Sequence, residues 1–353
     1  MAPRHHLSTT AALLALLWGV CPALHAQDVR LDTIPVAVVD LYGLSTVSEV
    51  VVRRALAIAP GAPIPDSAAR AAAIARVESI AGVRSARFNA VCCADSRGLL
   101  VYVGIEEEGA PTFRFAPAPT SDIRLPDEVV AAGEAFAVAF ADAVAHGDFA
   151  ETDTAGHAIM HWPAAGAVQR RFVDLAAEFA SELRNVLHNS AHPEQRALAA
   201  QVLGYAPDKA AVVSDLSDAL HDQDETVRNN AARVLALIAL LAQRRPELGI
   251  EVPYEAFLAM LQSPVWTDRN KASFALAQLT TNRDPELISI LRQRSLPALL
   301  EMARWNHLGH AGPALTILGR IAGLPEAEIS AALAAGNREA ILAAAEEITD
   351  GEP

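Results

Sequence analysis

The chain has 353 residues, of which 52% are hydrophobic, 20% charged and only 5% aromatic. This length is typical of two domains. The charged share, together with 19 Gly and 21 Pro, excludes global disorder and a collagen-like or low-complexity chain. Ala, Leu and Val carry most of the apolar content, which favours helices.

The first 26 residues have the pattern of a secretory signal peptide. Arg4 precedes an apolar stretch over residues 11–20, and small residues follow, so we expect cleavage after Ala26 and a periplasmic or secreted protein. The apolar stretch is shorter than the roughly 20 residues of a spanning helix, and no later run is longer, so we expect no stable membrane insertion after cleavage. Residues 27–33 are interpreted as a linker.

Charge narrows the class of partner. Without residues 1–26 the chain has 27 Lys and Arg against 42 Asp and Glu, a net charge of −15. Nucleic-acid binding needs clustered cations against the phosphates, and anionic membrane surfaces repel an acidic protein. We therefore expect a protein or peptide partner, whose identity the sequence does not give, and no nucleic acid.

Residues 34–109 alternate in type and predict an α+β module of order β-α-α-β-β. β-branched runs over 35–41, 83–93 and 99–107 are typical of strands. Thr46 and Glu49 have the spacing of a helix capping box, and Asp66 is placed to cap a second helix.

This module resembles a POTRA domain, a unit found in outer-membrane assembly and secretion proteins and in some cell-division proteins. The resemblance implies a three-stranded sheet under two helices, with a partner peptide adding as an extra strand at the sheet edge. POTRA domains usually precede a β-barrel or a membrane anchor, whereas helices follow here. The residues that carry the resemblance are Gly43, Val47, Ser48, Val52, Leu56, Ile58, Gly61, Ile64, Gly82, Val83 and the hairpin over 84–106.

Cys92 and Cys93 are adjacent and leave several interpretations open. Neighbouring Cα atoms lie about 3.8 Å apart, below the usual separation in disulfides, so a vicinal disulfide requires strain. An oxidising compartment nevertheless favours one. The alternatives are a pair of free thiols at a strand end, metal binding, and an intermolecular bridge.

A proline-containing linker over 110–125 precedes a region that is predicted to be helical over 126–348, with a disordered tail over 349–353. Pro126 and Gly147 bound a first helix, residues 172–187 predict a long second one, and 148–163 is expected to be a loop. Octets that begin at Arg196, Arg228, Arg269 and Ala311 then align at offsets of 32, 41 and 42 residues. Such periods predict stacked helix pairs.

The repeated segment resembles HEAT repeats, including the variant of phycobilin-lyase-like proteins, over residues 165–325. Asp224 is placed to cap a second helix in which Val227, Ala231 and Ile238 point inward. Pro313 interrupts the last copy, so we expect its helix to begin there. The resemblance implies a superhelix with a concave surface lined by second helices. The candidate contacts on that surface are Gln201, Asn229, Asn230, Arg233, Asn270 and Lys271.

Catalytic chemistry has little support in the sequence. His157 and His161 have the i, i+4 spacing of two zinc ligands, and His307 and His310 are a weaker pair. Neither lies in a His-Glu-x-x-His motif, and no nucleophile elbow, phosphate loop or dinucleotide fingerprint occurs. We therefore expect no catalytic, cofactor or metal site.

The sequence as a whole predicts an α+β, POTRA-like module followed by an all-α, HEAT-like superhelix. The expected function is an exported, non-enzymatic protein-binding scaffold. The alternatives are a metal-dependent periplasmic hydrolase that uses His157 and His161, and an envelope or outer-membrane assembly factor.

Overall fold

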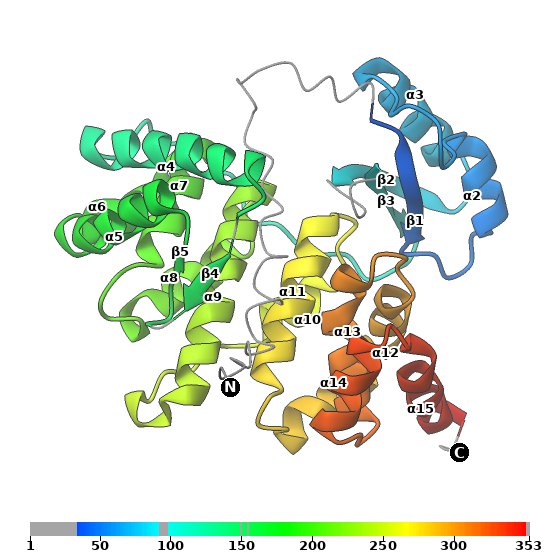
Figure 1. The fold of residues 1–353 in the computed structure, drawn as a ribbon. Coiled ribbons are helices and arrows are strands. Elements are labelled where there is room, and N and C mark those ends of the chain that lie inside the picture. Colours follow the sequence, from blue (N-terminus) through cyan, green and yellow to red (C-terminus); the bar gives the residue numbers. More distant parts are fainter. Residues whose placement is uncertain (1–33, 92–97, 149, 154, 351–353) are drawn as a thin grey trace, which may run out of the picture. The chain divides into compact units, whose positions relative to one another are not determined.

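The computed structural model describes residues 34–91, 98–148, 150–153 and 155–350 (Figure 1). The predicted signal peptide, the 27–33 linker and the Cys92–Cys93 pair lie outside the described residues, as do 351–353. The chain divides into two compact units. Unit 1 is Phe115–Ala256, and the described part of unit 2 comprises 34–114 and 257–350. The region predicted to be helical therefore contributes to both units, and the N-terminal sheet shares a unit with the C-terminal helices.

The N-terminal part of unit 2 has the predicted order of elements. It consists of β1 (Val36–Tyr42), α2 (Glu49–Leu56), α3 (Ser67–Glu78), β2 (Val83–Val91) and β3 (Leu99–Glu107). The strands form a three-stranded sheet of order β1-β3-β2, in which β1 is parallel and β2 antiparallel to β3 (Figure 1). The small mixed sheet is thus present, while its assignment as a POTRA domain stays a prediction.

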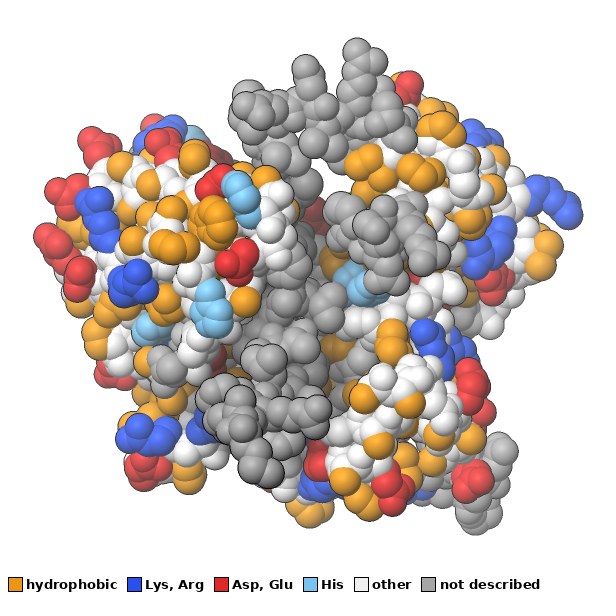
Figure 2. Space-filling model, viewed as in Figure 1, with side chains coloured by type: hydrophobic (Ala, Val, Ile, Leu, Met, Phe, Trp, Pro, Cys, Tyr) orange, Lys and Arg blue, Asp and Glu red, His pale blue; other side chains and the backbone are white. Residues whose placement is uncertain are grey.

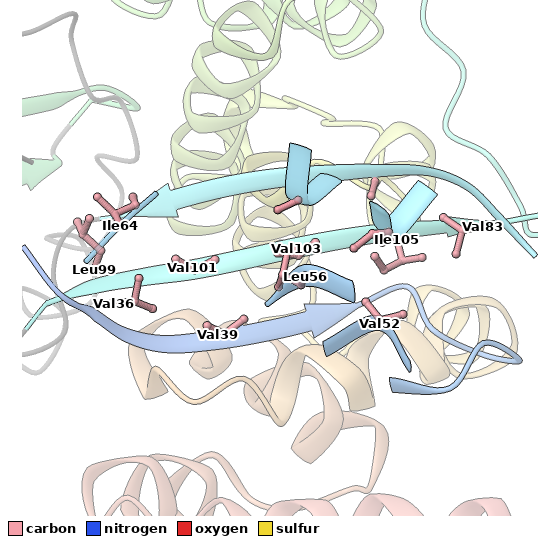
Figure 3. Packing of buried hydrophobic residues seen from close by; sticks show 13 residues of the cluster. Val36, Val39, Val52, Leu56, Ile64, Val83, Leu99, Val101, Val103 and Ile105 are labelled. Carbon is pink, nitrogen blue, oxygen red and sulfur yellow. The ribbon is translucent and has the colours of Figure 1, made fainter. Parts of the chain in front are cut away.

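Alternation along β3 separates two buried faces. Val101, Val103 and Ile105 lie in one core with Val52 and Leu56 of α2 (Figure 3). Successive strand residues point to opposite faces, so the residues between these three point away from that core. They are buried as well, which is typical of a strand covered on both sides.

One of the two helix caps predicted for this module is present in the structure, and the other is not. Asp66 accepts a hydrogen bond from the backbone N–H of Ala69 at 2.7 Å and caps α3, as predicted. The capping box at Thr46 is wrong, because α2 begins after Ser48 and Glu49 pairs with Arg53 instead. The hydroxyl of Thr46 donates to a carboxylate at the end of strand β3. No local sequence pattern could indicate this partner, because it is distant in the chain.

That carboxylate is Glu107, at the end of β3. Its oxygens accept hydrogen bonds from the backbone and hydroxyl groups of Ser45 and Thr46 and from the backbone of Val47. Burial opposes ionisation of Glu107, but these hydrogen bonds outweigh it and lower the pKa of the carboxyl to about 2. Glu107 therefore fixes the turn before α2 as a carboxylate.

Helices form the C-terminal part of unit 2. The bounds are α10 (Glu255–Met260, which begins at the end of unit 1), α11 (Trp266–Leu279), α12 (Pro285–Ala303), α13 (Leu308–Ile321), α14 (Glu326–Ala334) and α15 (Arg338–Asp350). The prediction that a helix begins at Pro313 is wrong, because α13 starts five residues earlier and carries this proline inside. The backbone of residue 313 has no N–H to donate, so one intrahelical hydrogen bond is missing there.

An aromatic layer joins the second face of the sheet to these helices. The ring of Tyr102 stacks on Trp266 at 5.1 Å between centroids, and its hydroxyl lies 2.7 Å from Nδ1 of His310. The hydroxyl of Tyr42 donates to the carbonyl of Pro264 at 2.7 Å. Gly104 is required here, since a Cβ at that position would lie 2.0 Å from the same carbonyl. His310 is therefore part of this packed layer, and its ring centroid lies 4.3 Å from that of His307.

Unit 1 is a helical array with one small hairpin (Figure 1). Two expectations are wrong. The long second helix breaks at Phe179, and the loop predicted over 148–163 contains two strands. The elements are α4 (Asp127–Ala145), β4 (Glu151–Asp153), β5 (Ala158–Met160), α5 (Pro163–Glu178), α6 (Ala180–Asn189), α7 (Pro193–Leu203), α8 (Ala210–Ala219), α9 (Glu225–Arg244) and the 3-10 helix η3 (Pro246–Leu248).

The second repeat follows the sequence prediction closely. Asp224 accepts hydrogen bonds from the backbone N–H groups of Thr226 and Val227 and caps α9. The apolar side chains predicted to point inward from α9 are all buried. Local capping and helical periodicity therefore sufficed to place this helix.

An arginine near the start of α7, α9 and α11 explains the repeat in the sequence. Arg196 donates to the carbonyl of Ser190, Arg228 to that of Asp222, and Arg269 to that of Ser263. Each acceptor lies six residues before its arginine, in the turn that enters the helix. The arginines are buried, and Arg196 also forms a two-point ion pair with the carboxylate of Asp222. The arginine thus satisfies turn carbonyls that would otherwise be buried without a donor.

The fourth copy has Ala311 in place of this arginine. Arg338, from α15, donates instead to the carbonyls of Ala303, Trp305 and Asn306. Trp305 lies six residues before Ala311, so Arg338 supplies the missing contact from a different helix. The last repeat is thereby completed by the C-terminal helix.

The segment predicted to be a linker over 110–125 makes ordered contacts within unit 1. The backbone N–H of Ala116 donates to the carbonyl of His221 at 2.7 Å, and that of Ser121 to Asn189 at 3.1 Å. The ring of Phe115 covers the guanidinium of Arg228 at 4.6 Å. This segment therefore covers the turns that enter α7 and α9. Among the described helices of the chain, none is both long and apolar enough to cross a bilayer.

Candidate binding pocket in unit 1

A cavity of about 670 Å³ lies between α4, α7, α9 and the β4-β5 hairpin. Its apolar walls come from Phe136 and Phe140 of α4, Leu198 of α7, and Val234 and Leu237 of α9. The volume is within the range of roughly 300–1,000 Å³ that is typical of ligand pockets. Unit 1 therefore has a site large enough for several side chains or a small organic molecule.

A glycine of α4 lies close to α7 at the cavity wall. A Cβ at Gly133 of α4 would lie 2.7 Å from a terminal methyl group of Leu198 of α7, so a larger residue at this position would displace the Leu198 side chain. A glycine inside a helical pattern is the sequence signal that could have indicated it. The prediction that only second helices line the surface missed α4.

Polar side chains of α7 and α9 face the same cavity. Asn230 donates to the carbonyl of Ala197 at 2.9 Å, and Asn229 donates to Oδ1 of Asn230 at 3.3 Å. Asn229 is only 3% exposed, and its own Oδ1 accepts no hydrogen bond from the described residues. A buried acceptor without a donor costs stability, so Asn229 adds an unsatisfied acceptor to the residues that line the cavity.

Arg233, one turn further along α9, is held by an ion pair. Its Nη2 lies 2.8 and 2.6 Å from the two carboxylate oxygens of Glu151, whose side chain is fully buried. Glu151 begins β4, so the hairpin that the sequence did not predict supplies this partner. The pair leaves Arg233 in a fixed position with its charge compensated.

His157 closes one end of the cavity in a neutral form. Burial, reinforced by the nearby ammonium of Lys209, lowers the pKa of His157 to about 4. Nδ1 of His157 lies 3.1 Å from Nζ of Lys209, which also donates to the carbonyl of Gly204 at 2.6 Å. Because an ammonium can only donate, Nδ1 accepts and the proton of the neutral ring is on Nε2. His157 therefore offers one N–H donor.

The alternative of a hydrolase would require His157 and His161 to bind one metal ion together, and the structure does not bring these two side chains together on one helix face. The two residues flank strand β5 rather than lying on a helix, and four residues of strand span about 13 Å. His161 lies 2.7 Å from the hydroxyl of Thr152. Among the described residues, no group of three or more His, Cys, Asp or Glu is arranged to hold a metal ion.

Four of the six predicted contact residues line one cavity: Gln201, Asn229, Asn230 and Arg233. The other two, Asn270 and Lys271, belong to α11 of unit 2, where they are 6% and 1% exposed. They do not line this cavity. The predicted surface is therefore concentrated in unit 1.

Comparison with known proteins supports the repeat architecture. A family model for HEAT repeats matches residues 180–277, which begin in α6 and end within α11. Among solved structures, a designed armadillo repeat protein in complex with the peptide (KR)4 is similar over 53% of this chain and 93% of that chain. The identity is 17% and the TM-score 0.35, too low for an argument from that structure. No curated protein matches the chain.

Proposed function

We propose that this chain is an exported, non-enzymatic scaffold that binds a protein partner through the cavity between α4, α7 and α9. The observation that carries the proposal is the buried acceptor of Asn229 beside the apolar walls of Phe136 and Leu198. A peptide segment supplies both an N–H donor and apolar side chains. HEAT repeat families are generally protein-binding scaffolds, and the match over 180–277 supports this class of function.

The edge strand β2 is a second surface of the proposed scaffold. The strand order leaves β2 at the edge of the sheet, where an added peptide strand could pair. The backbone N–H of Ala86 already donates to the carboxylate of Glu78 at 3.0 Å, so that position is occupied. Strand addition would begin beyond it, toward Val91.

Photocrosslinking in the native cell tests the cavity. p-Benzoylphenylalanine at Leu198 is expected to crosslink a discrete polypeptide, whereas the same group at Ala177, an exposed position of α5, gives none. Adding Asn229→Leu to the Leu198 variant removes the acceptor while it keeps the branching of the side chain, and should reduce the crosslink. If the two positions give identical products, or if only a small molecule is captured at Leu198, the proposal fails.

Export has a separate test. We expect the purified native protein to begin at Gln27 and to partition with periplasmic or secreted proteins. N-terminal sequencing and cell fractionation measure both. A chain that retains Met1 in the cytosol contradicts export and, with it, a role as an envelope assembly factor.

A further inference from the structure

The two units differ sharply in charge. Residues 115–256 contain 21 Asp and Glu against 10 Lys and Arg, a net charge of −11. Residues 34–114 and 257–353 contain 19 Asp and Glu against 16 Lys and Arg, a net charge of −3. Most of the negative charge of the protein therefore belongs to the unit that contains the cavity. The space-filling view shows acidic, basic and hydrophobic side chains interspersed on the visible face of that unit (Figure 2, left).

Acidic residues also lie at the cavity itself. Glu134 of α4 and Glu194 of α7 line it and are exposed, and Asp224 lines it at the start of α9. Arg233 is the only Lys or Arg among the described lining residues, and Glu151 compensates its charge. A buried apolar surface beneath exposed carboxylates is complementary to an apolar segment that carries cations.

We infer that the cavity selects a basic amphipathic segment of a partner protein. An apolar side chain of the segment occupies the space between Phe136, Phe140 and Leu198, a donor of the segment satisfies Oδ1 of Asn229, and flanking Lys or Arg side chains meet Glu134 and Glu194. This inference rests on the proposed function and adds the chemical class of the partner.

Selection from a phage library of random dodecapeptides on the full-length protein tests the charge preference. Selected peptides should be enriched in Lys and Arg beside Leu, Ile or Phe and depleted in Asp and Glu. Synthetic copies of the selected peptides should bind the Asn229→Leu protein at least about tenfold more weakly, because the loss of one buried hydrogen bond lowers affinity by about that factor.

A pair of double variants isolates the electrostatic contribution. Glu134→Gln with Glu194→Gln should weaken binding of a selected basic peptide by about 2- to 25-fold, because each exposed ion pair contributes about 1.5- to 5-fold. Asp174→Asn with Glu178→Gln removes two exposed charges of α5 that do not line the cavity and should change the affinity less than twofold. Added salt should weaken binding to the wild-type protein.

The outcomes separate this inference from the proposed function. Selected peptides that are neutral or acidic, yet depend on Asn229, overturn the charge preference and leave the scaffold in place. Equal effects of the two double variants also overturn it. If no selected peptide depends on Asn229 or Leu198, peptide binding at this cavity and the charge preference both fail.

Discussion

Unit 1 and unit 2 cover the same kind of turn with two different structures. In unit 1, the extended segment 115–125 lies over the turns that enter α7 and α9 and contributes backbone hydrogen bonds and one aromatic ring. In unit 2, a folded sheet covers the turns that enter α11 and α13. Tyr42 donates to Pro264 there, and the carboxylate of Asp40 accepts from the backbone of Asn306 at 2.9 Å.

In both units a further part of the chain covers the turn that enters the repeat helix. The repeat itself does not specify whether an extended segment or a sheet does so. The arginine is common to both units, with Arg228 beneath Phe115 and Arg269 beneath Tyr42 at 4.6 and 4.7 Å. Unit 2 adds a layer of buried aromatic rings, whereas unit 1 retains a cavity beside its repeat helices. Binding is therefore expected in unit 1, and unit 2 is expected to contribute stability.

The largest effect is expected from Asp222→Ala, which tests how the arginine of α7, Arg196, is held. This change leaves the guanidinium of Arg196 buried without its ion-pair partner, and we expect the free energy of unfolding to fall by about 3–5 kcal/mol. Urea denaturation measures the loss. Asp218→Ala, at an exposed position of α8, should change stability by less than about 0.5 kcal/mol. Equal effects of the two changes would mean that the repeat does not depend on its arginine.

The aromatic layer of unit 2 is tested by Tyr102→Phe. The ring remains, but Nδ1 of His310 loses its buried partner, so we expect a loss of about 1–3 kcal/mol. In unit 1, Tyr205→Phe leaves the carbonyl of Ala158 without its donor and should cost a similar amount. If Tyr102→Phe alone leaves stability unchanged, the hydrogen bond between Tyr102 and His310 does not stabilise unit 2. Thermal unfolding of both variants gives the comparison.

Arg338→Met tests whether α15 completes the last repeat. Carbonyls of Ala303, Trp305 and Asn306 lose their donor, and we expect a loss of about 1–2 kcal/mol. Arg294→Met, at an exposed position of α12, keeps the same change of residue type and should be nearly neutral. If both variants unfold at the same temperature, Arg338 does not supply the contact that is missing at Ala311.

The last test concerns the acid response of Glu107, which develops only below pH 4.5. Its folded pKa of about 2 lies below the ordinary value of 4.5, so the folded state favours the carboxylate. The resulting stability is fully present above pH 4.5 and is lost as pH falls through 2. Glu107→Gln should flatten the stability profile over this interval, whereas Glu108→Gln, at an exposed neighbour, should retain the wild-type slope. Parallel profiles for the wild type and Glu107→Gln would contradict the assignment.

The elements themselves were largely predictable from local patterns. Runs of β-branched residues located the strands of the sheet, and capping at Asp66 and Asp224 located two helix starts correctly. The sequence misplaced the start of α13 and missed the hairpin of Glu151, each for its own reason. Packing against neighbours overcomes a proline inside a helix, and strands of three residues have too few side chains to show a period.

The sequence by itself determined the repeat, the acidic character of residues 115–256 and four of the residues that line the cavity, because periodicity and charge are properties of the chain. Tertiary structure alone decided that α4 forms the opposite wall, that Glu151 compensates Arg233 and that Arg338 replaces an arginine missing at Ala311. These pairings join residues that are distant in the chain, and only the packed fold specifies which distant groups satisfy one another.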